Sequence, residues 1–155
     1  VPSWNAVTTY YHATTRPLDS EPVLRVDPTD GLLANSVVVS AVAPAYAPPG
    51  TNLVATSVLG VPSTVDETER RIRERLPRLY GVDAWTTVAT YPVPYALPAM
   101  PAPHPLRGRV RLGEGLYVCG DHRDTSSIQG ALASGRRAAH AVLADLRPRY
   151  PDFVQ

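Results

Sequence analysis

The sequence has no lysine, because all 15 of its basic residues are arginine. This absence excludes a lysine Schiff base and the lysine of a phosphate-binding P-loop within the chain. Cysteine is nearly absent too: Cys119 stands alone, so an intrachain disulfide and a cysteine-based metal cluster are excluded. This cysteine usage favours a reducing, cytoplasmic compartment.

The chain also lacks an excess of charge of either sign. The 15 basic residues face 14 acidic ones, for a net charge of +1, which gives no field to attract nucleic acid or an anionic membrane. The longest apolar stretch, residues 32–47, is interrupted by polar residues and proline and is shorter than the roughly 20 residues of a spanning helix. We therefore expect no nucleic-acid partner and no membrane span.

The chain has 155 residues, 44% of them hydrophobic and 17 of them proline. This composition predicts a folded unit with short elements and stiff connections. The stretch 92–105 holds six prolines, and we expect a rigid loop there because proline cannot donate to a β-ladder. Runs of apolar and β-branched residues predict strands at 4–16, 21–26, 37–42, 52–58, 84–91 and 115–119, the last of them buried.

Two segments have the pattern of helices. Residues 64–80 place apolar side chains on one face and Glu/Arg pairs four residues apart on the rest. The spacing from Thr64 to Glu67 predicts a capping box, Gly81 a C-terminal stop, and Pro77 a kinked or shortened last turn. The second helix, over 127–146, is rich in alanine and glycine. The order of elements predicts an α+β fold.

The segment between the last strand and the last helix has the pattern of a ligand site. Gly120 and Asp121 follow the apolar strand, which places a carboxylate where open α/β sheets bind ligands. The spacing from Ser126 to Gln129 predicts a helix cap, leaving free amides at the positive end of the helix. Such a site suits a ligand with both hydroxyl and carbonyl groups.

These residues, from Tyr117 to Asp121 and then Gly130-Ala131-x-x-Ser134-Gly135-x-x-Ala138-Ala139, resemble the late motif of FAD-dependent oxidoreductases. The superfamily is that of amine oxidases, protoporphyrinogen oxidase and phytoene-type desaturases. The resemblance implies that Asp121 binds the ribityl chain of FAD and that the amide of Ile128 meets a pyrimidine oxygen. The cofactor-binding residues that it implies are Gly120, Asp121, Ser127, Ile128, Gln129, Gly130 and Ala131.

A looser resemblance covers the earlier part of the chain. Tyr91 to Pro98 is similar to the stretch of the same family that leads from the substrate sheet toward the flavin, so Tyr91 and Tyr95 are expected near flavin or substrate. The resemblance implies an antiparallel substrate-domain sheet with the helix 64–80 and a proline-rich return loop over 1–105. Residues 106–155 would be the last strand and C-terminal helix of a Rossmann-type FAD domain, within an α/β parent.

The sequence also departs from the family. No Gly-x-Gly-x-x-Gly follows a strand, and Gly113-x-Gly115 precedes one instead, so the half of the site that binds the adenine end of FAD is missing. Ser127 stands where amine oxidases usually carry an aromatic residue. We therefore expect a fragment, inactive alone, of an enzyme that transfers a hydride to FAD from a small-molecule substrate. The substrate would be an amine, or a porphyrin- or polyene-like molecule oxidised at a C–C bond.

Other interpretations remain open. The remainder of the FAD domain could lie upstream in the same polypeptide or in another chain, in which case this chain would complete a processed flavin oxidase. Alternatively, the chain is a stand-alone α+β binding or interaction domain, Asp121 a turn residue, and Tyr91 and Tyr95 packing aromatics. The spacing of Asp121, His122 and Asp124 supports a metal site poorly, and none is expected. Cys119 is expected to be a small buried side chain.

Overall fold

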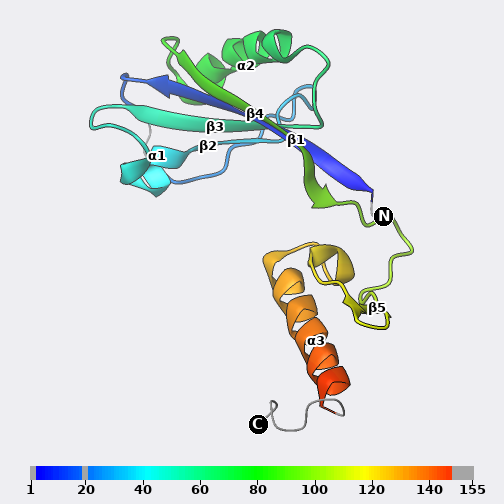
Figure 1. Ribbon diagram of the computed structural model, residues 1–155. Coiled ribbons are helices and arrows are strands. Elements are labelled where there is room, and N and C mark those ends of the chain that lie inside the picture. The colour runs from blue at the N-terminus through cyan, green and yellow to red at the C-terminus, as the bar shows by residue number, and fades with distance from the viewer. Residues whose placement is uncertain (1–2, 19–20, 148–155) are drawn as a thin grey trace. The chain divides into compact units, whose positions relative to one another are not determined.

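The computed structural model describes residues 3–18 and 21–147, which fold as a mixed α+β protein with an antiparallel sheet (Figure 1). It divides into two compact units. One is Asn5–Ala96, here called the sheet unit. The other, the α3 unit, comprises the remaining described residues, which lie on both sides of the sheet unit in the sequence.

The sheet unit is built on four strands in the order β2-β3-β1-β4. They are β1 (Trp4–Thr14), β2 (Asn35–Val38), β3 (Asn52–Leu59) and β4 (Thr86–Pro98). Trp4 of β1 and residues 97–98 of β4 belong to the α3 unit. β3 pairs antiparallel with both β1 and β2, so that Ala55 lies between Tyr11 and Val37. The expected strand over 37–42 is wrong beyond Val38, because the chain turns there into the short helix α1 (Val39–Val42), followed by the 3-10 turn η1 (Pro44–Tyr46). The expected strand 21–26 is only a single bridge, from Arg25 to Ser36.

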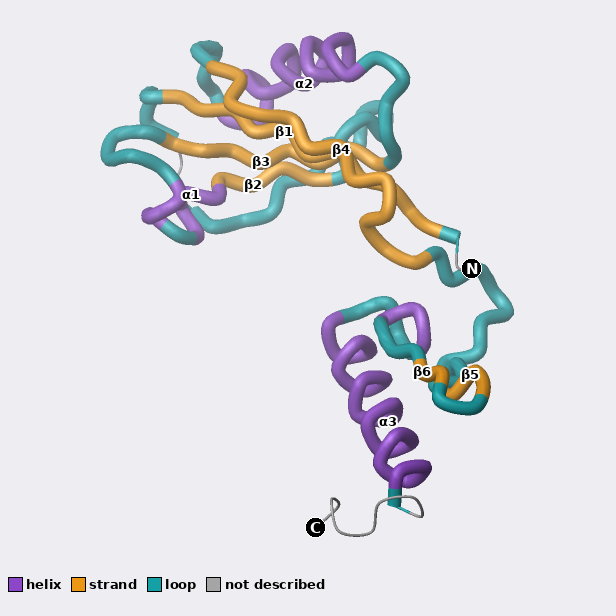
Figure 2. The backbone as a smooth tube through the Cα atoms, viewed as in Figure 1, coloured by secondary structure: helices purple, strands orange, loops and turns teal. Residues whose placement is uncertain are grey.

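The helix α2 (Val65–Tyr80) covers one face of this sheet (Figure 2). The side chains of β1 that face it are Thr8, Tyr10, His12 and Thr14, and all four are buried. Ile72 and Leu76 of α2 are fully buried against them. Each such side chain contributes about 1.5–3 kcal/mol by leaving water. The hydrophobic core of the molecule's described residues lies in this layer.

The ends of α2 differ in part from expectation. Gly81 ends the helix as expected, with φ 72° and its N–H bonded to the carbonyl of Pro77. The capping box does not form: Thr64 is the N-cap residue, but its side chain makes no capping bond, and its carbonyl accepts from Thr68 instead. Pro77 lies inside the helix, which continues to Tyr80 without being shortened.

The prediction of a loop over 92–105 is wrong for residues 92–98, because β4 continues to Pro98. The Ala99 N–H donates to the Ser3 carbonyl (2.8 Å). Tyr11 of β1, eight residues after Ser3, meets Tyr91, eight residues before Ala99, so β1 and β4 keep one antiparallel register between these two contacts. In this register the residues Pro92, Pro94 and Pro98 direct their backbone nitrogens away from β1. Since β4 is the edge strand, no ladder hydrogen bond is lost at these positions.

The α3 unit contains a small hairpin and a long helix. The hairpin pairs β5 (Arg111–Gly113) with β6 (Leu116–Tyr117), and the 3-10 turn η2 (Asp121–Arg123) leads to α3 (Ile128–Leu146). The expected buried strand over 115–119 is wrong: Leu116 is 57% exposed, and Cys119 is exposed as well. One hairpin and one helix provide no second layer to cover them. Residues 148–155, part of the expected C-terminal segment, lie outside the described residues.

In the part of the chain that the structure describes, no helix combines the length and apolarity needed to cross a membrane.

Candidate functional site

The turn from β6 into α3 is shaped by Gly120. Its φ of 138° is rare for residues with a side chain, and a Cβ there would lie 2.7 Å from His122 Nδ1. The buried Ser134 Oγ accepts from the Gly120 N–H (2.9 Å) and lies 2.7 Å from the Gly120 carbonyl oxygen. Both polar groups of Gly120 are therefore held by α3, which fixes the position of the next residue, Asp121.

Asp121 retains a free acceptor. Its Oδ1 accepts the backbone N–H of His122 (2.9 Å), and its side chain is 28% exposed. Within the described ranges its other carboxylate oxygen has no hydrogen-bond partner. The carboxylate is thus oriented through one oxygen and available for a ligand hydroxyl through the other.

The first turn of α3 leaves two amides free for a ligand. Ser127, not Ser126 as expected, is the cap: its Oγ accepts from Gly130 N (3.0 Å) and its carbonyl from Ala131 N (3.0 Å). The amides of Ile128 and Gln129 precede these and have no acceptor within the helix. They lie at the positive end of a 19-residue helix, where a carbonyl oxygen or an anion is stabilised.

Gly130 serves the chain's own packing. A Cβ on Gly130 would lie 1.9 Å from the carbonyl oxygen of Thr125, so only glycine lets the loop pass this close to α3. The small side chains of this helix are therefore used, at this position, by the chain's own packing. Next to it, Ser126 Oγ is buried without a hydrogen-bond partner among the described residues.

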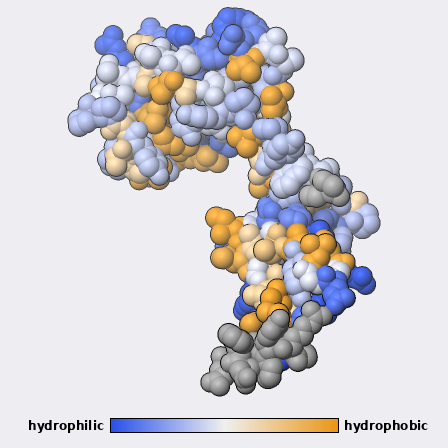
Figure 3. Space-filling view, in the orientation of Figure 1, coloured by the Kyte–Doolittle hydropathy of each residue, from blue (hydrophilic) through white to orange (hydrophobic). Residues whose placement is uncertain are grey.

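Apolar side chains flank the free amides. Ile128 is 79% exposed and Leu132, one turn later, is 70% exposed. Figure 3 shows that apolar surface of this kind is widespread on the α3 unit. Donor groups beside exposed apolar side chains suit a flat ring that has carbonyl oxygens on its edge. Asp124 does not join Asp121 at a metal site; it pairs with Arg137 (2.9 Å), and the described residues hold no cluster of three metal-ligating side chains.

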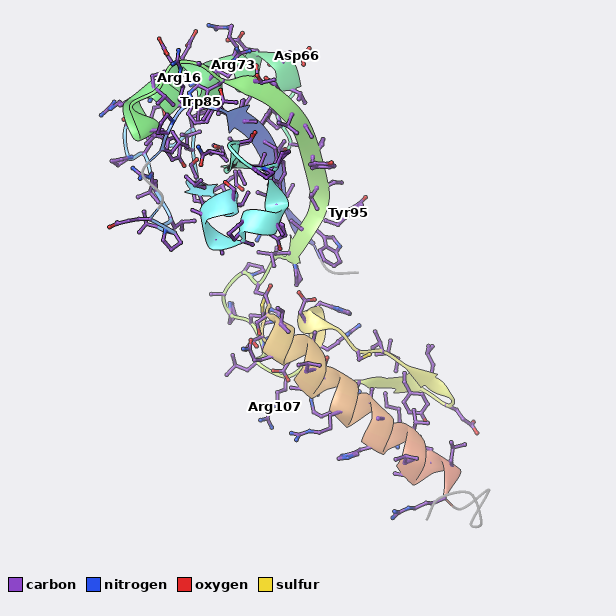
Figure 4. All side chains as sticks on the ribbon, turned by 90° about the vertical axis from the view of Figure 1, so that its left-hand side faces the viewer. Arg16, Asp66, Arg73, Trp85, Tyr95 and Arg107 are labelled. Carbon is purple, nitrogen blue, oxygen red and sulfur yellow. The ribbon has the colours of Figure 1, made fainter. Side chains whose placement is uncertain are left out.

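Tyr91 and Tyr95 lie in the sheet unit, on the face of the sheet opposite α2. The Tyr91 ring meets Tyr11 edge to face, with centroids 5.8 Å apart, and Tyr95 points away from β4 and is 71% exposed (Figure 4). We call this side of the sheet the open face. Its residues are Val7, Thr9, Tyr11 and Ala13 of β1, Asn35 and Val37 of β2, Leu53, Ala55, Ser57 and Leu59 of β3, and Tyr91, Val93 and Tyr95 of β4.

No residue of the open face is charged. Its polar groups are hydroxyls and an amide, including Thr9 and Ser57, whose side-chain oxygens are 3.2 Å apart. Sequence reasoning singled out Tyr91 and Tyr95 of this face but not Tyr11, Thr9 and Ser57, which lie on it as well. The alternation along β1 signalled two faces, but which face α2 covers depends on contacts distant in sequence.

Comparisons with known proteins bear on both the family and the fold. Residues 3–143 match the family described as flavin containing amine oxidoreductase. An oxidoreductase from Methanosarcina mazei has a similar fold, with a TM-score of 0.62 and 18% identity over 90% of this chain. The aligned region is 35% of that oxidoreductase, so this chain spans about a third of its length. A search of curated proteins gave no match. Because the family match covers nearly the whole chain, the chain belongs to the flavin containing amine oxidoreductases.

Proposed function

We propose that this chain is part of an FAD-dependent oxidoreductase that takes a hydride from an organic substrate. Membership of the family implies a flavin cofactor. The observation that carries the proposal is the pairing of a free carboxylate oxygen on Asp121 with the free amides of Ile128 and Gln129 on one strand-turn-helix segment.

The groups at this segment fit a flavin. Ribityl hydroxyls are donors, and the oxygen of Asp121 accepts; the pyrimidine oxygens accept, and the α3 amides donate. Gly120, Ser127, Gly130 and Ala131 contribute by holding the turn and the first helical turn in place. When bound, the flavin supplies the two-electron acceptor. The positive end of α3 favours negative charge on the ring by about 0.3–1 kcal/mol, and by up to about 2 kcal/mol in a partly buried site.

We further propose that residues 106–155 are the last strand and helix of a Rossmann-type FAD domain and that residues 1–105 belong to a substrate domain. The exposed apolar side chains of Leu116 and Leu132 support this assignment, because the neighbouring elements of such a domain would cover them. The remainder of the domain would come from upstream sequence or from another chain. Without it, the chain would be inactive.

The open face suggests the class of substrate. Tyrosine rings and small hydroxyl side chains without any charge suit an uncharged, largely apolar molecule, because a cationic amine would lose its hydration without gaining a counter-charge there. We therefore favour oxidation of a C–C bond, as in a polyene-like molecule, over oxidation of a charged amine.

Replacing Asp121 tests the proposed flavin contact. In the longest natural polypeptide that contains this chain, Asp121→Ala should weaken flavin binding roughly tenfold to a hundredfold, because a hydrogen bond to a charged group is lost. Asp121→Asn, which keeps one acceptor oxygen, should weaken it less. The measurement is the ratio of flavin to protein absorbance, together with the flavin dissociation constant.

Asp83→Asn is the matched control, since Asp83 is an exposed carboxylate in the sheet unit. Circular dichroism should be unchanged in all three variants. Equal flavin affinity in Asp121→Ala and the parent would refute the role of Asp121. A polypeptide that never carries flavin would instead favour the stand-alone binding domain.

A further inference from the structure

A cavity in the α3 unit has a chemistry unlike that of the flavin-contacting segment. Its volume is about 380 Å³, within the range of small-ligand pockets. One part of the wall is apolar and the rest carries hydrogen-bond donors. The lining residues are Ser3, Pro98, Ala99, Met100, His104, His122 and Arg123, and all of them belong to the α3 unit.

Arg123 is the main charge in this wall, and it has no counter-charge. Its side chain forms no hydrogen bond or ion pair with any described residue, and its Nε is buried. Nearby Arg137 also has a buried Nε without a partner among the described residues, but its terminal nitrogens bind Asp124 (2.9 Å) and the carbonyls of Gly108 (3.0 Å) and Arg123 (2.7 Å). A buried guanidinium N–H without an acceptor is unfavourable, so a ligand that accepts from it gains affinity.

Backbone contacts fix the turn that carries His122 and Arg123. The Arg123 carbonyl accepts from Gly108 N (2.9 Å) as well as from Arg137. Gly108 packs so closely that a Cβ on it would lie 3.3 Å from Arg123 Cδ, and the missing Cβ of Gly120 leaves room for the His122 ring. Because the backbone of the turn is fixed before any ligand arrives, only the side chains remain to be ordered on binding.

No carboxylate lines the cavity. Of the acidic residues next to it in sequence, Asp124 pairs with Arg137. Asp121 does not line the cavity, but its Oδ1 accepts the His122 backbone N–H and lies 4.0 Å from His122 Nδ1. The wall therefore combines one permanent cation with two imidazoles and a hydroxyl.

We propose that this cavity binds the oxyanion of a small ligand, a carboxylate or a phosphate, through Arg123, with His104, His122 and Ser3 as further donors. A guanidinium binds either group with two parallel hydrogen bonds. The apolar side chains of Pro98 and Met100 would contact the rest of the ligand. This site uses none of the groups assigned to the flavin, so it stands independently of that assignment.

Calorimetric titration tests this site in the longest natural polypeptide that contains the chain, in its flavin-loaded and flavin-free forms. The probes are benzoate and inorganic phosphate. Arg123→Gln should weaken binding about tenfold or more, and Arg123→Lys, which keeps the charge but not the paired donors, should weaken it less. Arg107→Gln is the control, because Arg107 is an exposed arginine between β4 and β5 (Figure 4) and does not line the cavity.

The outcomes separate the two sources of the oxyanion. Benzoate binding to both forms that depends on Arg123 indicates an organic carboxylate. Phosphate binding only to the flavin-free form indicates that a phosphate of the cofactor occupies the cavity. The proposal is overturned if neither anion binds either form at millimolar concentration, or if Arg123→Gln binds as tightly as the Arg107→Gln control. For an organic carboxylate, flavin content in Arg123→Gln should be unchanged, which keeps a failure here distinct from a failure of the Asp121 assignment. For a phosphate of the cofactor, flavin content should fall in Arg123→Gln.

Discussion

At the scale of single residues, His12 is the most unusual side chain of the core. It lies fully buried between β1 and α2, with Nε2 3.1 Å from Glu69 Oε1. Its Nδ1 is buried and has no hydrogen-bond partner among the described residues. Burial lowers the pKa of His12, and the hydrogen bond and charge of Glu69 oppose this only in part. The imidazole is therefore held neutral in the folded chain.

Protonation of His12 should destabilise the fold. The unfolded chain takes up this proton near the ordinary histidine pKa of about 6.5, whereas the folded chain takes it up only at lower pH, so the free energy of unfolding should fall as the pH drops below about 6.5. Urea unfolding at pH 7.5 and 5.5 measures this dependence. His12→Gln, whose amide can still reach Glu69 but does not titrate, should show a smaller loss. If both proteins lost the same free energy of unfolding, the pH dependence would not come from His12.

The sequence predicts site residues where the prediction depends on local spacing. Asp121, Ile128 and Gln129 could be proposed because a strand, a turn and a helix follow one another within a few positions. Contacts across the fold were not accessible in this way. The contact of His12 with Glu69 spans 57 positions, and the cavity around Arg123 joins segments from Ser3 to the turn after β6.

At the scale of elements, α3 contains two glycines in different surroundings. A Cβ at Gly130 would collide with the Thr125 carbonyl, whereas a Cβ at Gly135 would meet nothing within 4 Å. Gly130→Ala should therefore destabilise the start of the helix by about 1–3 kcal/mol. Gly135→Ala should stabilise it by up to about 1 kcal/mol.

Thermal unfolding followed by circular dichroism at 222 nm compares the two variants directly. Both place alanine in the same helix, so differences in helix propensity largely cancel. Shifts of the same sign and size would show that the approach of the loop to α3 does not matter for stability.

Helices and strands were predicted correctly where the sequence pattern was long. Prediction failed where the element depends on which strands pair in the sheet. The 3.6-residue period of α2 and the alternation of β1 both predicted the observed elements. β4 was underestimated because its prolines argue against a strand until its place at the edge of the sheet is known. The run before Cys119 has the composition of a buried strand, but burial requires neighbours that this hairpin lacks.

At the scale of the whole molecule, the core is unequally divided. The cluster that includes Tyr10, Val54, Ile72 and Leu76 lies in the sheet unit. The buried residues of α3 are Gly130, Ser134 and Ala138, which together bury little apolar area. Hydrogen exchange on the isolated chain should therefore be slowest in β1, β3 and α2 and at least about tenfold faster in α3, because local opening costs less where fewer apolar contacts are lost.

Mass spectrometry of peptides after timed exchange provides this comparison. If α3 is the flavin-contacting helix of a larger domain, its exchange should slow in the longest natural polypeptide with flavin bound, while β3 changes little. Equal protection of α3 and β3 in the isolated chain would contradict the inference that the hydrophobic core lies mainly in the sheet unit.

The prolines of β4 also limit how the protein assembles. An incoming strand would find carbonyl acceptors along the outer side of β4 but no donors at Pro92, Pro94 and Pro98, so it could not form a continuous ladder. The sheet is thereby closed to β-augmentation and to fibril-like stacking of copies along this edge. The same residues that obscured the strand in the sequence protect the folded chain from self-association through it.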